Sequence, residues 1–336
     1  LPKIEACYNL LPTTTGLLAA CNESIFIIEN GQVNKLAAPK VNFLVLQRLA
    51  ADKEQYLIGH SRGLGLVSAK ENSWQYQAIA EQELTFPVQA ISQDKHQQLW
   101  LTTGGQGITK VVFNNGFNSA PQISHYEHQH GLPQGYISPS VIGQQLIFNT
   151  DKGFYQFEEN AVSTQSRFIP ATSLIDPLIG KNVYIHQQDN GLIWLKQEPQ
   201  RGESSKHHQS KIALVHAKRI SNGVRLYQWD FEQFNGIVSD MGVSLYAEEN
   251  GIFWIANNEQ LLRYDSKLKP APHRPKTPTI SQITDLSTPD KPLVNLHQKA
   301  IPPLAYQNNS LRLHFAFASF EKAGFNRFQY QLQGYD

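Results

Sequence analysis

The sequence has few cysteines, few charges and no long apolar run, and each scarcity excludes a class of protein. Its 336 residues include two cysteines, Cys7 and Cys21, which are too few for a zinc site. Charged residues make up 17%, and 29 Lys and Arg oppose 28 Asp and Glu for a formal net charge of +1. Nucleic acid is excluded as a partner, because phosphate binding needs a clustered positive excess. No stretch approaches the roughly 18 apolar residues of a membrane helix, so we expect a membrane contact only through a segment outside this chain.

The two cysteines flank a predicted turn at residues 12–16, whose sequence is Pro-Thr-Thr-Thr-Gly. A hairpin centred on Thr14 would place Cys7 opposite Cys21, and in an oxidising compartment the pair could form a disulfide. Two small buried apolar side chains are the alternative interpretation.

The main signal is an internal repeat of a short apolar strand, a polar or glycine-containing turn and a second apolar strand. The copies occupy residues 17–26, 57–66, 99–108, 146–155, 193–195 and 253–262. We take one residue of the first strand in each copy as its anchor, at positions 18, 58, 100, 147, 194 and 254. The spacings between successive anchors are 40, 42, 47, 47 and 60 residues. A polar insertion at 197–211 lengthens the last spacing.

Strands at this density, with almost no helical periodicity, predict an all-β protein with one four-stranded sheet every 40 to 47 residues. We therefore expect a β-propeller of six to seven four-stranded blades over residues 1–268. The aromatic residues at the anchors, such as Trp100, are expected to pack between blades and not to line a ligand-binding site.

The last part of the chain has a different pattern. Residues 269–278 form a proline-rich joint, which is expected to be extended and semi-rigid. In residues 279–336, apolar and polar residues alternate over Leu311–Phe317 and again over Phe328–Leu332, as in half-buried antiparallel strands. We expect these to be the first strands of an immunoglobulin-like β-sandwich, which needs about 100 residues, and therefore expect a fragment of a longer protein.

Several segments carry a family resemblance. Residues 94–108 and 248–261 follow a D-x-x-G-x-[IL]-W-[IL]-x-T-x-x-G-[IL] pattern that resembles the two-component regulator propeller (Reg_prop) repeat, and residues 130–137 resemble the segment that opens a blade. Residues 304–336 are similar to the start of the three-tyrosine (Y_Y_Y) domain, although Phe328 stands where that family usually has Tyr.

The resemblance implies the ligand-sensing region of a bacterial transmembrane receptor, either a hybrid histidine kinase or a GGDEF diguanylate cyclase. It further implies a periplasmic location as part of an inner-membrane protein and a homodimer in the full-length receptor. No catalytic motif of either output domain is in the sequence, so this chain is expected to be non-catalytic.

The alternative is a carbohydrate-active enzyme, a lyase or glycoside hydrolase, which needs two carboxylates converging on a sugar. The acidic residues lie mostly at predicted turns, where a structural role is favoured. His125, His128 and His130 have no Cys or carboxylate at ligand spacing, so no metal site is predicted. No phosphate-binding loop is found, and no cofactor is expected.

Propeller topology indicates where a ligand could bind. The loops between second and third strands share one face with the loops that enter from the previous blade. The residues presented there would be His60, Ser61, Arg62, Gln106, His130, Gln134, Tyr136, Asp151, Lys152, Asn257 and Glu259. Amides, one Tyr and a few charges suit a small-molecule or oligosaccharide ligand, and plain solvent exposure is the competing interpretation.

Overall fold

A computed structural model gives the fold of the chain. It describes residues 6–49, 54–70, 73–104, 107–142, 145–159, 167–171, 183–187, 193–197, 211–219, 225–230, 234, 244–248, 250–257, 260–268, 278–286, 292–295, 303, 310–317 and 328–331. Within these ranges no helix has the length and apolarity needed to cross a bilayer.

Five antiparallel sheets of four strands follow one another along the chain. The first two are β1 (Cys7–Pro12), β2 (Gly16–Cys21), β3 (Ile25–Glu29) and β4 (Gln32–Leu36), then β5 (Phe43–Arg48), β6 (Gln55–His60), β7 (Gly63–Lys70) and β8 (Ser73–Ile79). The third is β9 (Val88–Gln93), β10 (Leu99–Thr103), β11 (Ile108–Val112) and β12 (Gln122–Tyr126). The last two are β13 (Ser138–Ile142), β14 (Gln145–Thr150), β15 (Gly153–Phe157) and β16 (Phe168–Pro170), then β17 (Val183–Gln187), β18 (Ile193–Gln197), β19 (Lys211–Arg219) and β20 (Arg225–Asp230).

Two smaller sheets complete the described structure. β21 (Ser244–Ala247), β22 (Ile252–Ala256) and β23 (Leu261–Asp265) form a three-stranded sheet in the same up-and-down order. β24 (Thr279–Asp285), β25 (Pro292–Asn295) and β26 (Leu311–Ala316) form another, in the order β25-β24-β26. A 3-10 turn, η1 (His128–His130), lies between β12 and β13.

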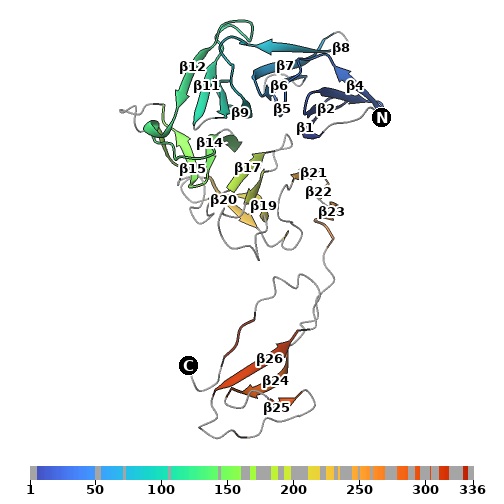
Figure 1. Cartoon of the computed structure of the whole chain (residues 1–336), viewed down its shortest axis with the longest axis vertical. Coiled ribbons are helices and arrows are strands. Elements are labelled where there is room, and N and C mark those ends of the chain that lie inside the picture. The colour runs from blue at the N-terminus through green and yellow to red at the C-terminus, as the bar shows by residue number, and fades with distance from the viewer. Residues whose placement is uncertain are drawn as a thin grey trace.

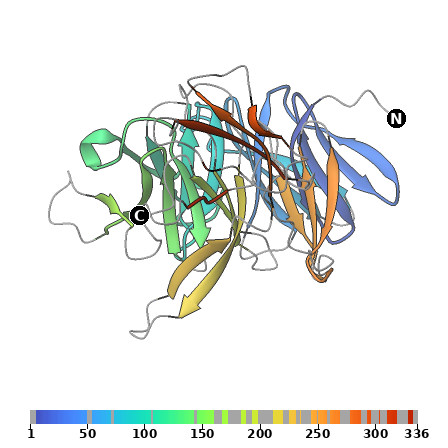
Figure 2. The same ribbon diagram turned by 90° about the horizontal axis from the view of Figure 1, so that it is seen from below.

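The sheets are arranged around a common centre, as in a propeller. Figure 1 shows the first strands β1, β5, β9 and β17 toward the centre and the fourth strands β4, β8, β12 and β20 toward the outside. First strands of successive sheets also lie next to one another, from β1 to β5, β9, β13 and β17. Seen from below, the sheets stand side by side with their connections at two ends (Figure 2). The predicted all-β, propeller-like architecture is therefore confirmed, with five sheets of four strands.

The core lies between the sheets. Each interface holds its own apolar cluster because every strand alternates its side chains between two neighbouring sheets. Leu18 and Phe43 belong to the first interface, Leu57 and Leu101 to the second, and Trp100 to the third. Trp100 is 1% exposed, so its predicted role in packing between sheets is confirmed.

Polar side chains near the end of the second strand tie the third sheet to the fourth and the fourth sheet to the fifth. Thr102 Oγ1 donates to Ile137 O at 2.6 Å, and Asn149 Oδ1 accepts from the Ile185 backbone N–H at 3.2 Å. At the matching place in β6, Gly59 has no room for a side chain, since a Cβ would lie 2.6 Å from a β9 carbonyl. The sheets therefore approach closely here, either through hydrogen bonds or through glycine.

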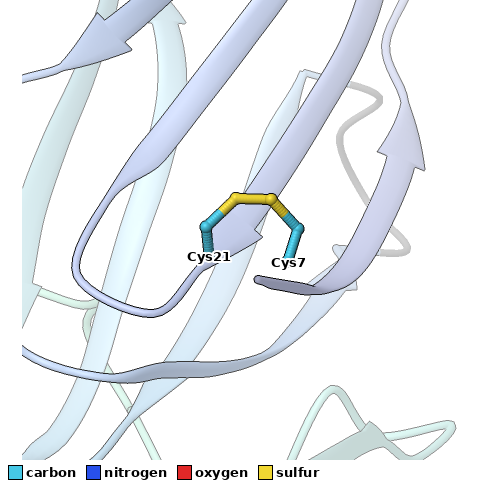
Figure 3. Close-up of a disulfide and its surroundings, with 2 residues drawn as sticks. All are labelled: Cys7 and Cys21. Carbon is cyan, nitrogen blue, oxygen red and sulfur yellow. A yellow bond between two sulfur atoms is a disulfide. The ribbon is translucent and has the colours of Figure 1, made fainter. Parts of the chain in front are cut away.

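Cys7 and Cys21 form a disulfide across β1 and β2 (Figure 3). The hairpin is centred between Thr14 and Thr15, since Leu11 pairs with Leu18. That register alone would place Tyr8 opposite Cys21. A register shift between Cys7 and Asn9 brings Cys7 opposite Cys21 instead. The pairing that the sequence left open is therefore formed, through a register shift and not through a hairpin centred on Thr14.

The C-terminal sheet departs from expectation in two ways. Residues 328–331 are described but form no strand, although their alternating pattern predicts one. In β26 the apolar face remains half-exposed, with Leu313 at 52% and Phe315 at 50%. The physical reason is that a three-stranded sheet has no second layer within the described residues to cover that face. The predicted proline-rich joint lies almost wholly outside the described residues, as does the insertion at 198–210.

Candidate functional site

The candidate site is the end of the propeller where the β6–β7, β14–β15 and β22–β23 turns meet the connections between sheets. This end is hereafter called the turn face. In an up-and-down sheet, the turn between the second and third strands lies at the same end as the entry from the preceding sheet. The structure places the described residues of the predicted set on these turns and connections, except His60, which is the last residue of β6. Gln106 and Glu259 lie outside the described residues.

His60 ends β6 and is buried, with 6% exposure. Its Nε2 lies 3.2 Å from the Tyr76 hydroxyl, and its Nδ1 accepts from the Arg62 backbone N–H at 3.2 Å. Burial, with a smaller contribution from the charge of Arg62, lowers the pKa of His60 to about 4. Burial, followed by the charge of Glu81, raises the pKa of Tyr76 to about 12. His60 is therefore a neutral imidazole that holds the β6–β7 turn from inside, whereas Arg62 is exposed at its tip.

The connection from β12 to β13 meets the β14–β15 turn. Gln134 and Tyr136 are exposed on either side of Gly135, which has a φ of +120°. A Cβ on Gly135 would lie 3.6 Å from the Asp151 carboxylate. Lys152, next along that turn, is exposed and donates its backbone N–H to Thr150 Oγ1 at 3.1 Å. Two predicted segments, 134–136 and 151–152, are thus brought together.

The other predicted residues lie apart from this pair of segments. Asn257 follows β22 and shapes its own turn, since its Oδ1 accepts from the Gln260 backbone N–H at 2.7 Å. His130 closes η1, where its Nδ1 accepts from the Glu127 backbone N–H at 2.9 Å. Its ring contacts Tyr126, with centroids 5.5 Å apart, and this places His130 at the interface between the third and fourth sheets.

The three neighbouring histidines do not converge. His125 Nδ1 lies 2.9 Å from Thr109 Oγ1, and His128 Nδ1 lies 2.9 Å from Leu132 O. His130 takes the separate bond described above. Across the described part of the chain, no three His, Cys, Asp or Glu side chains are grouped so that they could hold a metal ion.

Two cavities that the sequence did not predict lie between the third and fourth sheets. One, of about 510 Å³, is lined by residues that include Gln98, Lys110, Tyr126, His130, Phe157 and Arg167. The other, of about 340 Å³, is lined by Asp94, Trp100 and Glu158 among others, and the two share Phe157 and Glu159. Only His130 belongs to the predicted set. The available sequence signal was Lys110, the charged residue of β11, whose other residues are Ile, Thr and Val.

Comparison with known proteins supports the fold. No family model and no curated protein matches the chain. Among solved structures, the chain is similar to the extracellular domain of a putative hybrid two component system from B. thetaiotaomicron, with a TM-score of 0.52 and 11% identity over 94% of this chain and 47% of that one. A second such extracellular domain from B. thetaiotaomicron matches with a TM-score of 0.43 and 12% identity, over 81% of this chain and 45% of that one.

An ancestral GH74 enzyme also matches, with a TM-score of 0.48 and 11% identity over 77% of this chain and 36% of that one. The chain thus spans less than half the length of these three solved structures. At these identities the first similarity establishes a shared fold, and the fold alone does not determine function.

Proposed function

We propose that the chain is the extracytoplasmic ligand-sensing region of a bacterial transmembrane signalling receptor and that it performs no chemistry itself. The observation that carries the proposal is the propeller-like fold, shared over 94% of the chain with an extracellular domain of a putative hybrid two component system. The regulator-propeller and three-tyrosine patterns support the same assignment. The output is then a histidine kinase or a diguanylate cyclase outside this chain, in a protein of the inner membrane.

The ligand of this proposal is a small molecule or an oligosaccharide at the turn face. Gln134 and Tyr136 are exposed there, next to the turn that carries Asp151 and Lys152. An amide, a phenol and two charges on adjacent backbone segments offer both donors and acceptors to a polyhydroxylated ligand.

A thermal-shift screen over oligosaccharides, peptides and small acids tests the sensing role. A ligand present at 100 times its dissociation constant should stabilise the protein by about 2.7 kcal/mol. Asp151→Asn with Lys152→Gln should abolish that shift, whereas the matched surface variant Lys35→Gln on β4 should keep it. A ligand whose shift survives the double variant would place the site elsewhere.

Product analysis separates sensing from the alternative of a carbohydrate-active enzyme. The chain is incubated with each stabilising saccharide, and the mixture is analysed by chromatography with mass detection. The proposal predicts unchanged saccharide. Release of shorter or unsaturated products, lost in a carboxylate variant, would overturn it.

Receptor dimerisation is the second part of the proposal. A ligand can shift a dimer only by its different affinity for two arrangements, commonly worth about 1–3 kcal/mol. Sedimentation of this chain and of the complete extracytoplasmic region should give a monomer and a dimer, respectively. A complete region that stays monomeric with its ligand bound would rule out this mechanism.

A further inference from the structure

The two cavities between sheets β9–β12 and β13–β16 adjoin, because both are lined by Phe157 and Glu159, and together they are hereafter called the inter-sheet groove. None of its lining residues except His130 belongs to the predicted ligand site. The groove is therefore a feature distinct from the turn face, and its chemistry can be read from its own side chains.

Lys110 occupies a position that three other sheets fill with an aliphatic residue and that the sheet β21–β23 fills with Arg263, opposite Trp254. In β11 it pairs with Trp100, whose ring packs against the next sheet. The corresponding third-strand residues in three other sheets are Ile27, paired with Leu18, Leu66, paired with Leu57, and Leu214, paired with Trp194. All three are buried in apolar clusters between sheets. Only in the third of these four sheets does an ammonium group replace that aliphatic contact.

The ammonium of Lys110 rests on aromatic rings and has no carboxylate partner among the described residues. Its Nζ lies 5.0 Å from the ring centroid of Trp100 and 5.3 Å from that of Phe157. Arg167 Nη1 donates to the backbone carbonyl of Glu159 at 2.7 Å, so this guanidinium is fixed by a neutral group. Lys110 and Arg167 are thus held in place by neutral groups, and no described side chain neutralises their charges.

The carboxylates of the groove are largely occupied by protein donors. Asp94 accepts from Trp100 Nε1 and from the backbone N–H of His96, each at 2.9 Å. Glu158 accepts from Gln156 Nε2 at 2.9 Å. Glu159 lines both cavities as well, so the larger cavity presents Lys110 and Arg167 against one carboxylate, and this excess favours an anionic group there.

Gln98 supplies a second, independent indication of a ligand. This residue lines the larger cavity, and its Oε1 is buried with no hydrogen-bond partner. Leaving a buried acceptor without a donor is energetically unfavourable, so the site is incomplete as the protein presents it. A hydroxyl group is the simplest donor that would complete it once the side chain turns Oε1 toward the cavity, because that atom is covered in the structure.

We propose that the inter-sheet groove binds an acidic saccharide, with a uronate carboxylate at Lys110 and Arg167 and a sugar hydroxyl donating to Gln98 Oε1. The combined lobes, of about 510 and 340 Å³, are far larger than a phosphate or sulfate ion requires. An extended peptide is disfavoured, because β11 is paired on both sides, to β10 and to β12, and offers no open strand edge.

Calorimetric titration of the 336-residue chain with a linear galacturonate trisaccharide tests the proposal. Saturable binding is expected, and Lys110→Leu should weaken it about tenfold or more, since a charge-assisted hydrogen bond is lost. Leucine is the residue that β7 places at the corresponding position, so the variant should fold. Gln98→Glu, nearly isosteric, should weaken binding by a similar factor through charge repulsion. The control Arg62→Gln, on the turn face, should change the affinity by less than about twofold.

Two further titrations define the ligand chemistry. The neutral galactose trisaccharide should bind at least about tenfold more weakly than the uronate. Sulfate should compete only weakly, because it cannot donate to Gln98. Equal affinity for the neutral sugar, full competition by sulfate, unchanged binding to Lys110→Leu, or no binding of the uronate at millimolar concentration would each overturn the proposal. The groove is separate from the turn face, so its failure leaves the proposed sensing function standing.

Discussion

Two neighbouring interfaces of the ring solve the same packing problem differently. Between sheets β5–β8 and β9–β12 the contact is aliphatic, with Leu57 and Leu66 facing Leu99 and Leu101. Between sheets β9–β12 and β13–β16 an aromatic cluster around Trp100 takes over, and a cation and a groove lie beside it. Both interfaces hold the sheets together, but of the two only the second has, among the described residues, a buried acceptor without a hydrogen-bond partner, Gln98 Oε1. The difference indicates that packing alone does not account for the second interface.

Removing Trp100, the centre of the aromatic cluster, should have the largest effect on the free energy of unfolding. Trp100 is 1% exposed, and its ring contacts Tyr126, Phe148 and Phe157. Trp100→Ala should therefore lower the free energy of unfolding by about 3–5 kcal/mol. Urea denaturation measures it, with Trp254→Ala, a less buried anchor, as the milder control. A loss below about 1 kcal/mol would show that the aromatic cluster does not hold the interface.

Opening the disulfide should have the second-largest effect on the free energy of unfolding. Cys7 and Cys21 are 14 positions apart, and a crosslink closing about 15 residues stabilises by about 3 kcal/mol. Cys7→Ser with Cys21→Ser should lose about this much in urea denaturation without reductant. Reduction with dithiothreitol should reproduce the loss in the wild type and leave the double variant unchanged. Equal stability of the oxidised and reduced wild type would contradict the pairing.

Cutting a polar tie between sheets should have a moderate effect. Asn149 is buried, with Nδ2 donating to Ser138 O at 2.8 Å and Oδ1 accepting from Ile185 N. Asn149→Ala leaves these groups without partners and should cost about 1–3 kcal/mol. The exposed Asn118→Ala is the matched control and should stay within about 0.5 kcal/mol. Equal effects of the two substitutions would contradict the assigned role of Asn149.

The last effect concerns the turn face and depends on pH. His60 has its pKa lowered to about 4 from an unfolded value of 6.5, so the unfolded state binds a proton first as pH falls. Its contribution to stability is complete above pH 6.5 and is lost progressively toward pH 4. The melting temperature should therefore fall less steeply over this window in His60→Gln than in the wild type. Parallel curves would show that His60 titrates normally in the folded protein.

Much of the fold follows from local patterns in the sequence. Six anchor segments predicted strands, and β2, β6, β10, β14, β18 and β22 all form at them. The turn at 93–96 was predicted from its Asx residue, and Asp94 Oδ1 does accept from the backbone N–H of His96 and Gln98. These features depend on neighbours in the chain, which is why sequence alone reveals them.

The site was less predictable because it depends on contacts between sheets. Topology placed Gln134 and Asp151 on one face, and the structure brings their segments together. It could not show that His60 turns inward onto Tyr76, since that contact spans two strands of a sheet. The groove was not predicted because Lys110 stands out only when it is compared with Leu66, which holds the corresponding pairing position in β7. Those pairings are known only from the folded sheets.

The stability of Lys110→Leu in the absence of any ligand tests most directly whether packing accounts for the second interface. If Lys110 is present for binding, leucine should supply the aliphatic contact found in three other sheets and leave the free energy of unfolding unchanged or raised by up to about 1 kcal/mol. Urea denaturation of the two proteins side by side gives the difference. A loss of about 2 kcal/mol or more would contradict the account, because Lys110 would then be a structural element of the interface.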